Sequence, residues 1–204
     1  MNRDEELRVI REVLTGRTDR FEALVLAHQK GIYNLCLRML GNEQDALDAS
    51  QEAFFRAYRS LASFRGGSRF SVWLYRLASN VCLDMLRKRP SAPELPLENE
   101  DGDALPLPDT RPTPQAELEK KELRQAVYRA LESLPPEFRQ AVVLRDVNGL
   151  SYDEIGRVMK LEPGTVKSRI FRARKKLAAK LMQDGNFSGY GPSEQTRKGG
   201  ARHV

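Results

Sequence analysis

A run of basic side chains near the end of the chain has the clearest chemical meaning in this sequence. Residues 167–180 include seven Lys or Arg residues and neither Asp nor Glu. Val166, Ile170 and Leu177 recur at helical spacing, which predicts a helix with one buried stripe and a basic outer face. Such a face can neutralise phosphates and donate hydrogen bonds to base edges in the major groove of DNA. A merely solvated amphipathic helix is the alternative.

The residues before the basic run favour DNA binding. Ser151 and Glu154 have the spacing of a capping box that opens a short helix, and a turn follows at residues 160–162. Pro163 suits the first position of the next helix, because that position needs no backbone N–H donor. Gly156 leaves room for the two helices to cross closely. The sequence therefore predicts a helix-turn-helix whose second helix enters the major groove.

Composition limits the class of protein. The chain has 204 residues, 40% hydrophobic and 30% charged, enough for one or two small domains. Its net charge of +6 favours a polyanionic partner. Cys36 and Cys82 lie among apolar residues and are expected to be small core residues in a reducing compartment. The sequence shows no metal-ligand cluster, membrane-spanning run or signal peptide, so we expect a cytoplasmic protein without metal, cofactor, membrane insertion or small-molecule substrate.

A change in composition divides the chain. Residues 91–110 contain six acids and no Lys or Arg, and seven of the eleven prolines lie within residues 90–114. Such a stretch is typical of an extended, disordered linker. We therefore expect a first domain over residues 1–90, an acidic linker over 91–117, a second domain over 118–183, and a disordered tail over 184–204.

Helical periodicity runs through both expected domains. Leu7, Ile10 and Leu14 predict a first helix, and Asp19 is a candidate cap for a second helix that ends at Gly41. Further helices are expected over residues 45–61, 70–89, 118–134 and 136–147, followed by the helix-turn-helix. No segment alternates with period two, so the predicted fold class is all-α, with two small helical domains joined by a flexible, Pro-rich linker.

Three blocks of sequence, in this order, resemble one known family. Residues 45–58 read DAxDxxQExFxRAY and residues 70–87 read FxxWLxxxAxNxxxDxxR. Both are similar to the promoter-opening domain (region 2) of sigma factors. Residues 134–177 read LPxxxRxxxxLrxxxglSYxEIgxxxxxxxGTVKSRxxRARxxL and resemble their C-terminal domain (region 4). Because only a short linker joins the two, the chain resembles the extracytoplasmic-function (ECF) group of the sigma-70 family. The resemblance implies a subunit that binds core RNA polymerase, directs it to −35 and −10 promoter elements, and helps melt the DNA.

The resemblance implies that the third helix binds core RNA polymerase. Asp48, Gln51 and Glu52 share a polar face, and in the family this face docks on a coiled coil of the largest polymerase subunit. The chain departs from the family pattern at Leu47 and Ser50, but those three residues are intact. Without the family, a solvated helix face is the simpler interpretation. The candidate polymerase-binding residues are Asp45, Asp48, Gln51, Glu52 and Phe55.

The fourth helix and the Gly-rich loop before it (residues 64–69) are the −10 reader by resemblance. The loop would capture one flipped base, and exposed polar residues of the helix would contact the single strand. Trp73 is expected in the core. Asp84 and Arg87 could equally form a structural ion pair at i,i+3. The candidate −10 residues are Phe64, Arg65, Gly66, Ser68, Arg69, Arg76, Ser79 and Asn80.

By resemblance, the second helix of the helix-turn-helix reads the −35 duplex. Arg172 is the best candidate for a base contact, because a guanidinium matches the major-groove edge of guanine. Lys167, Arg174 and Lys176 lie toward the flanks and are expected to meet phosphates. The candidate −35 residues are Thr165, Lys167, Ser168, Arg169, Arg172, Lys175 and Lys176.

Three other functions compete with that of a sigma factor. A stand-alone helix-turn-helix regulator would leave the first domain unexplained. A sigma-like decoy that sequesters an anti-sigma factor need not keep a basic reading helix. An enzyme is disfavoured because the sequence shows no nucleophile–base set, paired carboxylates or phosphate loop. We therefore expect core polymerase and promoter DNA as partners, with an anti-sigma factor as a further partner.

Overall fold

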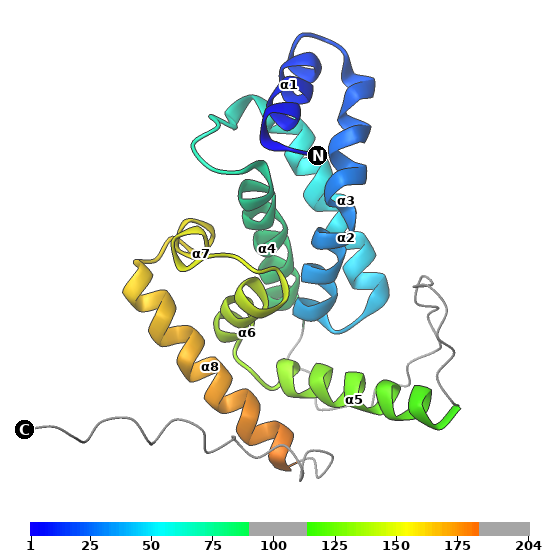
Figure 1. Cartoon of the computed structure of the whole chain (residues 1–204), viewed down its shortest axis with the longest axis vertical. Helices are drawn as coiled ribbons and strands as arrows, with labels where there is room; N and C mark the ends of the chain where they lie inside the picture. Colours follow the sequence, from blue (N-terminus) through cyan, green and yellow to red (C-terminus); the bar gives the residue numbers. More distant parts are fainter. Residues whose placement is uncertain (90–113, 184–204) are drawn as a thin grey trace, which may run out of the picture.

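The structure is a computed structural model that describes residues 1–89 and 114–183, except the side chains of 114–121. Throughout these ranges the regular structure is helical, which confirms the predicted all-α class. The helices form an N-terminal group, α1 to α4, and a C-terminal group, α5 to α8 (Figure 1). The predicted linker lies outside the described residues except for its end, where α5 already begins at Pro114. The predicted tail also lies outside them.

The N-terminal domain is built on three long helices that pack on one another. They are α2 (Phe21–Leu40), α3 (Glu43–Arg59) and α4 (Phe70–Lys88). Small residues such as Ala49 and Ala53 are fully buried where α3 meets its neighbours, which lets the helices approach closely. Gly41 ends α2 with a φ of 74°, a left-handed value that glycine adopts without strain. Trp73 is only 7% exposed, so its predicted core position is confirmed.

Two details of α1 (Arg3–Leu14) and α2 differ from the sequence prediction. On α1 the buried face is formed by Glu6, Val9, Ile10 and Val13, and Leu14 is 50% exposed. The helix is rotated because Glu6 turns inward to His28, at 2.9 Å between Oε1 and Nε2. Asp19 is not a helix cap, because a 3₁₀ turn over Thr18–Arg20 leads directly into α2.

The C-terminal domain contains the predicted helix-turn-helix. It comprises α5 (Pro114–Glu132), α6 (Pro136–Val142), a π-helical turn (Val143–Val147), α7 (Tyr152–Met159) and α8 (Pro163–Gln183). The capping box of Ser151 and Glu154 is present. A Cβ on Gly156 would lie 2.6 Å from the carbonyl oxygen of Leu161, so the tight turn requires glycine there. Val166 and Ile170 are buried, as the periodicity predicted.

The two domains pack against each other, which the sequence did not predict. Helix α7 lies on α4, and the π-helical turn, α5 and α6 lie on α2 (Figure 1). Buried apolar residues of both domains form one continuous core. Arg139 of α6 donates from Nη1 to the carbonyl oxygen of Met39 at the end of α2. We call this arrangement the closed form.

Candidate DNA-reading and polymerase-binding surfaces

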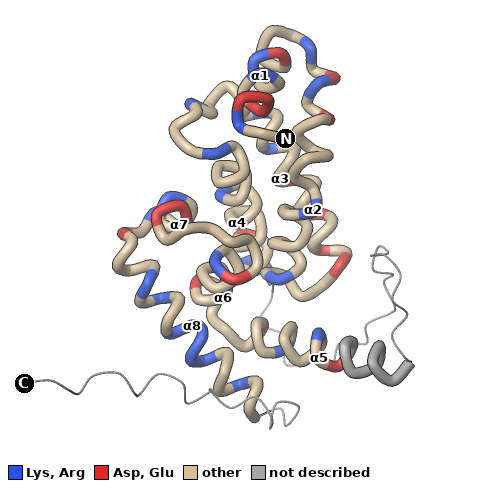
Figure 2. Tube along the Cα trace, viewed as in Figure 1, with Lys and Arg blue, Asp and Glu red and all other residues tan. Residues whose placement is uncertain are grey.

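Helix α8 presents a basic outer face. Basic residues recur along its length in Figure 2, and no acid lies between Pro163 and Gln183. Arg172 and Lys175 form no ion pair within the described residues, so their charges are available to a ligand. Of the candidate −35 residues, Thr165, Lys167, Ser168, Arg172, Lys175 and Lys176 are exposed, and Arg169 is half-buried.

Arg174 is engaged within the protein. Its Nε lies 3.0 Å from Oδ2 of Asp146, and its Nη2 contacts the other carboxylate oxygen. This bidentate pair ties α8 to the π-helical turn, and the hydrogen bond raises the pKa of Arg174 above its ordinary value. Its expected phosphate role would therefore compete with a contact that braces the reading helix.

Phe171 is a candidate that the sequence reasoning did not assign. Its side chain is 70% exposed on the outer face of α8, between Ser168 and Arg172. An apolar side chain on a groove-reading face can contact the methyl group of thymine. Its position on the helix, opposite the buried stripe of Val166 and Ile170, is the sequence signal that could have identified Phe171 as an exposed residue.

The Gly-rich loop is anchored by aromatic residues. The Phe64 ring centroid lies 5.4 Å from that of Phe70 and 5.5 Å from that of Trp73. Phe64 is therefore half-buried in a cluster at the start of α4, where it fixes one end of the loop rather than lying free for a base. Arg65 is exposed beside it.

Helix α1 supports the middle of the loop. Arg3 donates from Nη2 to the carbonyl oxygen of Gly66 at 3.0 Å, and Leu7 lies against Gly66. Gly66 has a φ of 71°, so this bend favours glycine. Ser68 and Arg69 follow at the start of α4, where Ser68 donates from Oγ to its neighbour's carbonyl oxygen at 3.3 Å.

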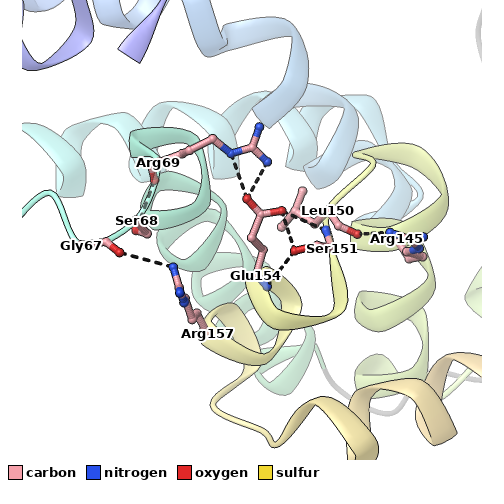
Figure 3. Close-up of polar contacts among 8 residues, drawn as sticks. All are labelled: Gly67, Ser68, Arg69, Arg145, Leu150, Ser151, Glu154 and Arg157. Carbon is pink, nitrogen blue, oxygen red and sulfur yellow. Dashed lines mark hydrogen bonds and ion pairs between the residues drawn. The ribbon is translucent and has the colours of Figure 1, made fainter. Parts of the chain in front are cut away.

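Polar contacts also connect the loop to α7 (Figure 3). Glu154 Oε1 accepts hydrogen bonds from Nε and Nη2 of Arg69, at 2.9 and 2.6 Å. Arg157 donates to the carbonyl oxygen of Gly67 at 3.3 Å. The loop is thus held at Gly67 and at Arg69 by the first helix of the helix-turn-helix.

On α4 the structure corrects one candidate. Asn80 is exposed and Arg76 is half-buried, but Ser79 is fully buried, so its expected exposure is wrong in the closed form. Tyr75, one turn earlier on the same face, contacts Asn148 of the other domain. Helical periodicity in α4 alone did not indicate the burial of Ser79.

Helix α3 presents the predicted polymerase-binding residues on its outer side. Asp48 and Gln51 are exposed, and Phe55 is 54% exposed. Glu52 pairs with Arg56 at 2.7 Å, and Asp45 pairs with Arg89 at the end of α4. We call Asp48, Gln51, Glu52 and Phe55 the α3 face.

A shallow hollow of about 380 Å³ adjoins the α3 face. It is lined by Glu52, Phe55, Arg56, Arg59, Ser60 and Leu77. Arg59 lies over the Phe55 ring, 5.5 Å from its centroid. The face thus combines acids, an exposed aromatic ring and an apolar recess, a composition suited to an anchored protein contact.

Asp84 and Arg87 form the structural ion pair that was one of the two expectations. Arg87 Nη1 lies 3.2 Å from Asp84 Oδ1, and Arg56 of α3 lies 3.6 Å from the other carboxylate oxygen. Asp84 therefore bridges α3 and α4.

Comparison with known proteins shows which family the chain belongs to. A family model described as Sigma-70 region 2 matches residues 24–91, and one described as Sigma-70, region 4 matches residues 124–177. The chain is 43% identical over 157 residues to the ECF RNA polymerase sigma factor SigE of Mycolicibacterium smegmatis, covering 77% of this chain and 60% of that protein. It is 39% identical over 178 residues to the ECF RNA polymerase sigma-E factor of Escherichia coli K12, covering 85% of this chain and 93% of that protein.

A solved structure supports the same assignment. CnrH, in complex with the cytosolic domain of CnrY, superposes with a TM-score of 0.64 at 26% identity, covering 86% of this chain and 96% of that chain. The chain belongs to the sigma-70 family of RNA polymerase sigma factors, in the extracytoplasmic-function group. It directs transcription initiation by RNA polymerase and is not an enzyme. In the described residues, no helix is long and apolar enough to cross a bilayer.

Proposed function

We propose that the chain reads a bipartite promoter, with α8 on the −35 duplex and the Gly-rich loop with α4 on the −10 strand. The observation that carries this proposal is the exposed, acid-free basic face of α8 on a correctly capped helix-turn-helix. Arg172 and Phe171 project from that face and can distinguish guanine and thymine edges. Lys167 and Lys176 flank them and would neutralise phosphates.

The α3 face is the proposed docking site for core polymerase. Its acids can pair with arginines of the partner, and Phe55 with the adjoining recess can supply an apolar anchor. The face stays open in the closed form. The polymerase-binding role therefore requires no prior separation of the domains.

We further propose an anti-sigma protein as a partner and the cytoplasm as the location. CnrH, which is similar to this chain, is bound to the cytosolic domain of another protein in its solved structure. The resemblance to the ECF group supports both parts of this proposal. Co-purification of the tagged chain from its own cells, with identification of bound proteins of the inner membrane or cytoplasm, tests it.

Run-off transcription with purified core polymerase on a randomised promoter library tests the promoter proposal. We expect selected templates to share two separated sequence elements. The upstream element would be read as duplex, and the downstream element would be read as a single strand in the region that melts. Arg172→Ala should relax selection in the upstream element only. Selection of a single element, or of none, would contradict the assignment of two readers.

A further inference from the structure

The first helix of the chain supports the middle of the Gly-rich loop. The carbonyl oxygen of Gly66 accepts a hydrogen bond of 3.0 Å from Nη2 of Arg3, and Leu7 lies against Gly66. Helix α1 also packs on the 3₁₀ turn Leu61–Ser63, which leads into the loop. All these contacts lie within the N-terminal domain, so they do not depend on the C-terminal domain.

Arg3 stands where the helix alone disfavours a cation. It is the first residue of α1, and the N-terminal end of a helix carries a partial positive charge. The acids Asp4, Glu5 and Glu6 follow in the first turn and suit that end of the helix. The hydrogen bond to Gly66 therefore gives a reason for a cation at this position that the helix itself does not give.

The start of α1 is fixed, so the Arg3 side chain leaves the helix from a defined point. Asn2 and Glu5 form a capping box, in which Asn2 Oδ1 accepts from the Glu5 N–H at 2.9 Å and Glu5 Oε2 accepts from the Asn2 N–H at 3.2 Å. Further along the helix, Val9 and Ile10 are buried, each at most 4% exposed. Helix α1 is thus both capped and anchored in the core.

Helix α1 and the start of the loop share one support. Glu6 of α1 contacts His28 at 2.9 Å, and the His28 ring centroid lies 5.5 Å from that of Phe70. Phe64, the first residue of the loop, also packs on Phe70, at 5.4 Å between centroids. This cluster sets the positions of the helix and of the start of the loop, and from that helix Arg3 reaches the middle of the loop.

Holding the Gly66 carbonyl group also orients the next N–H. The peptide bond between Gly66 and Gly67 is planar and trans, so the carbonyl oxygen of Gly66 and the N–H of Gly67 point in opposite directions. Because the oxygen points to Arg3, the N–H points away from α1. That N–H donates to no backbone carbonyl among the described residues, and Gly67 is exposed. It is therefore a donor to which a DNA strand can offer an acceptor.

We propose that Arg3 is a positioning residue for −10 recognition, which fixes the peptide plane between Gly66 and Gly67 and so sets the shape in which the loop captures its base. This inference rests on the proposed −10 role of the loop. Without the hydrogen bond, the loop samples more conformations and has to be ordered when the strand binds, which lowers both affinity and discrimination. Arg3 acts through Gly66 and contacts no base itself.

Arg3→Ala tests the positioning role, with Arg8→Ala as the matched control. Each variant removes an exposed arginine from α1, but Arg8 pairs with Glu12 at 3.2 Å and not with the loop. Alanine is a strong helix former, and loss of a cation from the first position of a helix does not weaken that helix. A loss of −10 selection in Arg3→Ala therefore cannot come from unfolding of α1. Arg3→Lys keeps a cationic donor at this position.

Selection from the randomised promoter library measures the effect in the holoenzyme. In Arg3→Ala, selection at the most selective −10 position should fall roughly three- to fivefold, the range for an exposed charged contact, while −35 selection is unchanged. Arg8→Ala should match the native chain, and Arg3→Lys should lie between the native chain and Arg3→Ala. Equal −10 selection by the native chain and Arg3→Ala would overturn the proposal.

Salt dependence separates positioning from a direct phosphate contact. The holoenzyme is titrated with a fluorescent single-stranded oligonucleotide that contains the selected −10 element. If Arg3 neutralised a phosphate, Arg3→Ala would reduce the slope of log K against log salt by about 0.7. The positioning role predicts weaker binding with an unchanged slope, so a slope reduced by that amount would overturn it in favour of a direct contact.

Trypsin reports the order of the loop without DNA. Arg65 is exposed directly before Gly66, and cleavage after Arg65 tracks the fraction of molecules in which the loop is open. Mass spectrometry should show this cleavage roughly three- to fivefold faster in Arg3→Ala than in the native chain or Arg8→Ala. An unchanged rate would overturn the positioning role.

The proposed function and this inference fail in different ways. A native chain that selects no −10 base would remove the −10 role of the loop, and the inference with it. Native selection that Arg3→Ala leaves intact would keep the proposed function and remove the inference alone. An equal fall in −35 and −10 selection in Arg3→Ala would show general damage and would also overturn the positioning role. Loss of −10 selection alone, with faster cleavage after Arg65, supports both.

Discussion

At the scale of single residues, the reading helix should divide into base-reading and phosphate-neutralising positions. Arg172 is exposed and unpaired among the described residues, so Arg172→Ala should relax preference at one −35 base by about 1–3 kcal/mol. Lys176→Ala should weaken all sequences alike and reduce the slope of log K against log salt by about 0.9. Fluorescence anisotropy on duplexes with single base changes, over a salt series, measures both. Equal loss of discrimination in both variants would refute the division.

The pair of His28 and Glu6 predicts a pH dependence of stability. Burial lowers the pKa of His28 below its ordinary value, against the opposing attraction of Glu6. A histidine with a lowered pKa binds fewer protons folded than unfolded, so it stabilises the fold fully above its unfolded pKa of about 6.5. That contribution is lost as pH falls below this value toward the folded pKa.

Urea unfolding between pH 5 and 8 checks this prediction. The free energy of unfolding should fall between about pH 6.5 and pH 5 in the native chain, and His28→Gln should flatten that part of the profile. His203→Gln changes the other histidine and serves as the control. A native profile that is flat across this range would contradict the account.

At the scale of residues, the sequence predicted those features that depend only on neighbouring residues in the chain. The capping box, the left-handed Gly41 and the exposed basic positions of α8 depend on neighbours within a turn or two, and the structure confirms them. Glu6 and Ser79 could not be placed, because their burial depends on partners distant in sequence. Sequence reasoning predicts that an acid is exposed unless its histidine partner is known. It likewise predicts that a polar helix face is exposed unless the position of the second domain is known.

At the scale of elements, the turn of the helix-turn-helix should be intolerant of a side chain at Gly156. A Cβ there would lie 2.6 Å from the carbonyl oxygen of Leu161, and backbone must move to relieve the clash. Gly156→Ala should lower the free energy of unfolding by about 1–3 kcal/mol. Gly164→Ala is the control, because a Cβ at that position meets nothing within 4 Å. It should be neutral or stabilise by about 0.4–1 kcal/mol. Thermal unfolding compares the two, and equal destabilisation would contradict the packing argument.

Helix α3 should bind core polymerase through its outer face. Replacing Asp48, Gln51 and Glu52 by alanine should weaken holoenzyme formation, whereas exposed substitutions of this kind change stability by under about 0.5 kcal/mol each. Glu122→Ala, an exposed acid on α5, is the control. Titration of labelled chain with core polymerase measures the affinity. An unchanged affinity in a folded triple variant would remove α3 from the interface.

The positions of the helices along the chain were largely predictable from the sequence. Which face of each helix is buried was less predictable. Apolar periodicity gave α2, α3 and α4 with ends within a few residues of those observed. For α1 the stripe was wrong by one position, because Leu7 and Leu14 outweighed Val9 and Val13 in the pattern while Glu6 determined the inward face. Periodicity ranks residues by hydrophobicity and cannot anticipate a buried contact between a glutamate and a distant histidine.

At the scale of the whole molecule, the relation between the two domains was beyond sequence reasoning. Apolar periodicity indicates the inward face of each helix but not which distant helix covers that face. The polar contacts that join the two domains include a carbonyl acceptor on Met39, a hydroxyl on Tyr75 and an arginine on the Gly-rich loop, which carry no periodic signal.

The predicted acidic linker adds a whole-molecule expectation that concerns residues outside those described. Scrambling residues 91–110 at constant composition should leave initiation nearly normal. Halving the segment should impair use of both promoter elements together, because a tether too short for its span removes the effective-concentration advantage. Abortive and run-off transcripts from the two variants measure this. A scramble as damaging as the deletion would indicate a sequence-specific contact.

The most direct test of the central claim is promoter-specific transcription by a reconstituted holoenzyme. Core polymerase should be combined with the native chain on three templates: an intact selected promoter, one with a scrambled −35 element, and one with a scrambled −10 element. The account predicts run-off transcript from the intact template only, and none from core polymerase alone. Equal transcript from all three templates, or transcript that does not depend on the chain, would contradict the claim that this protein directs initiation by reading two promoter elements.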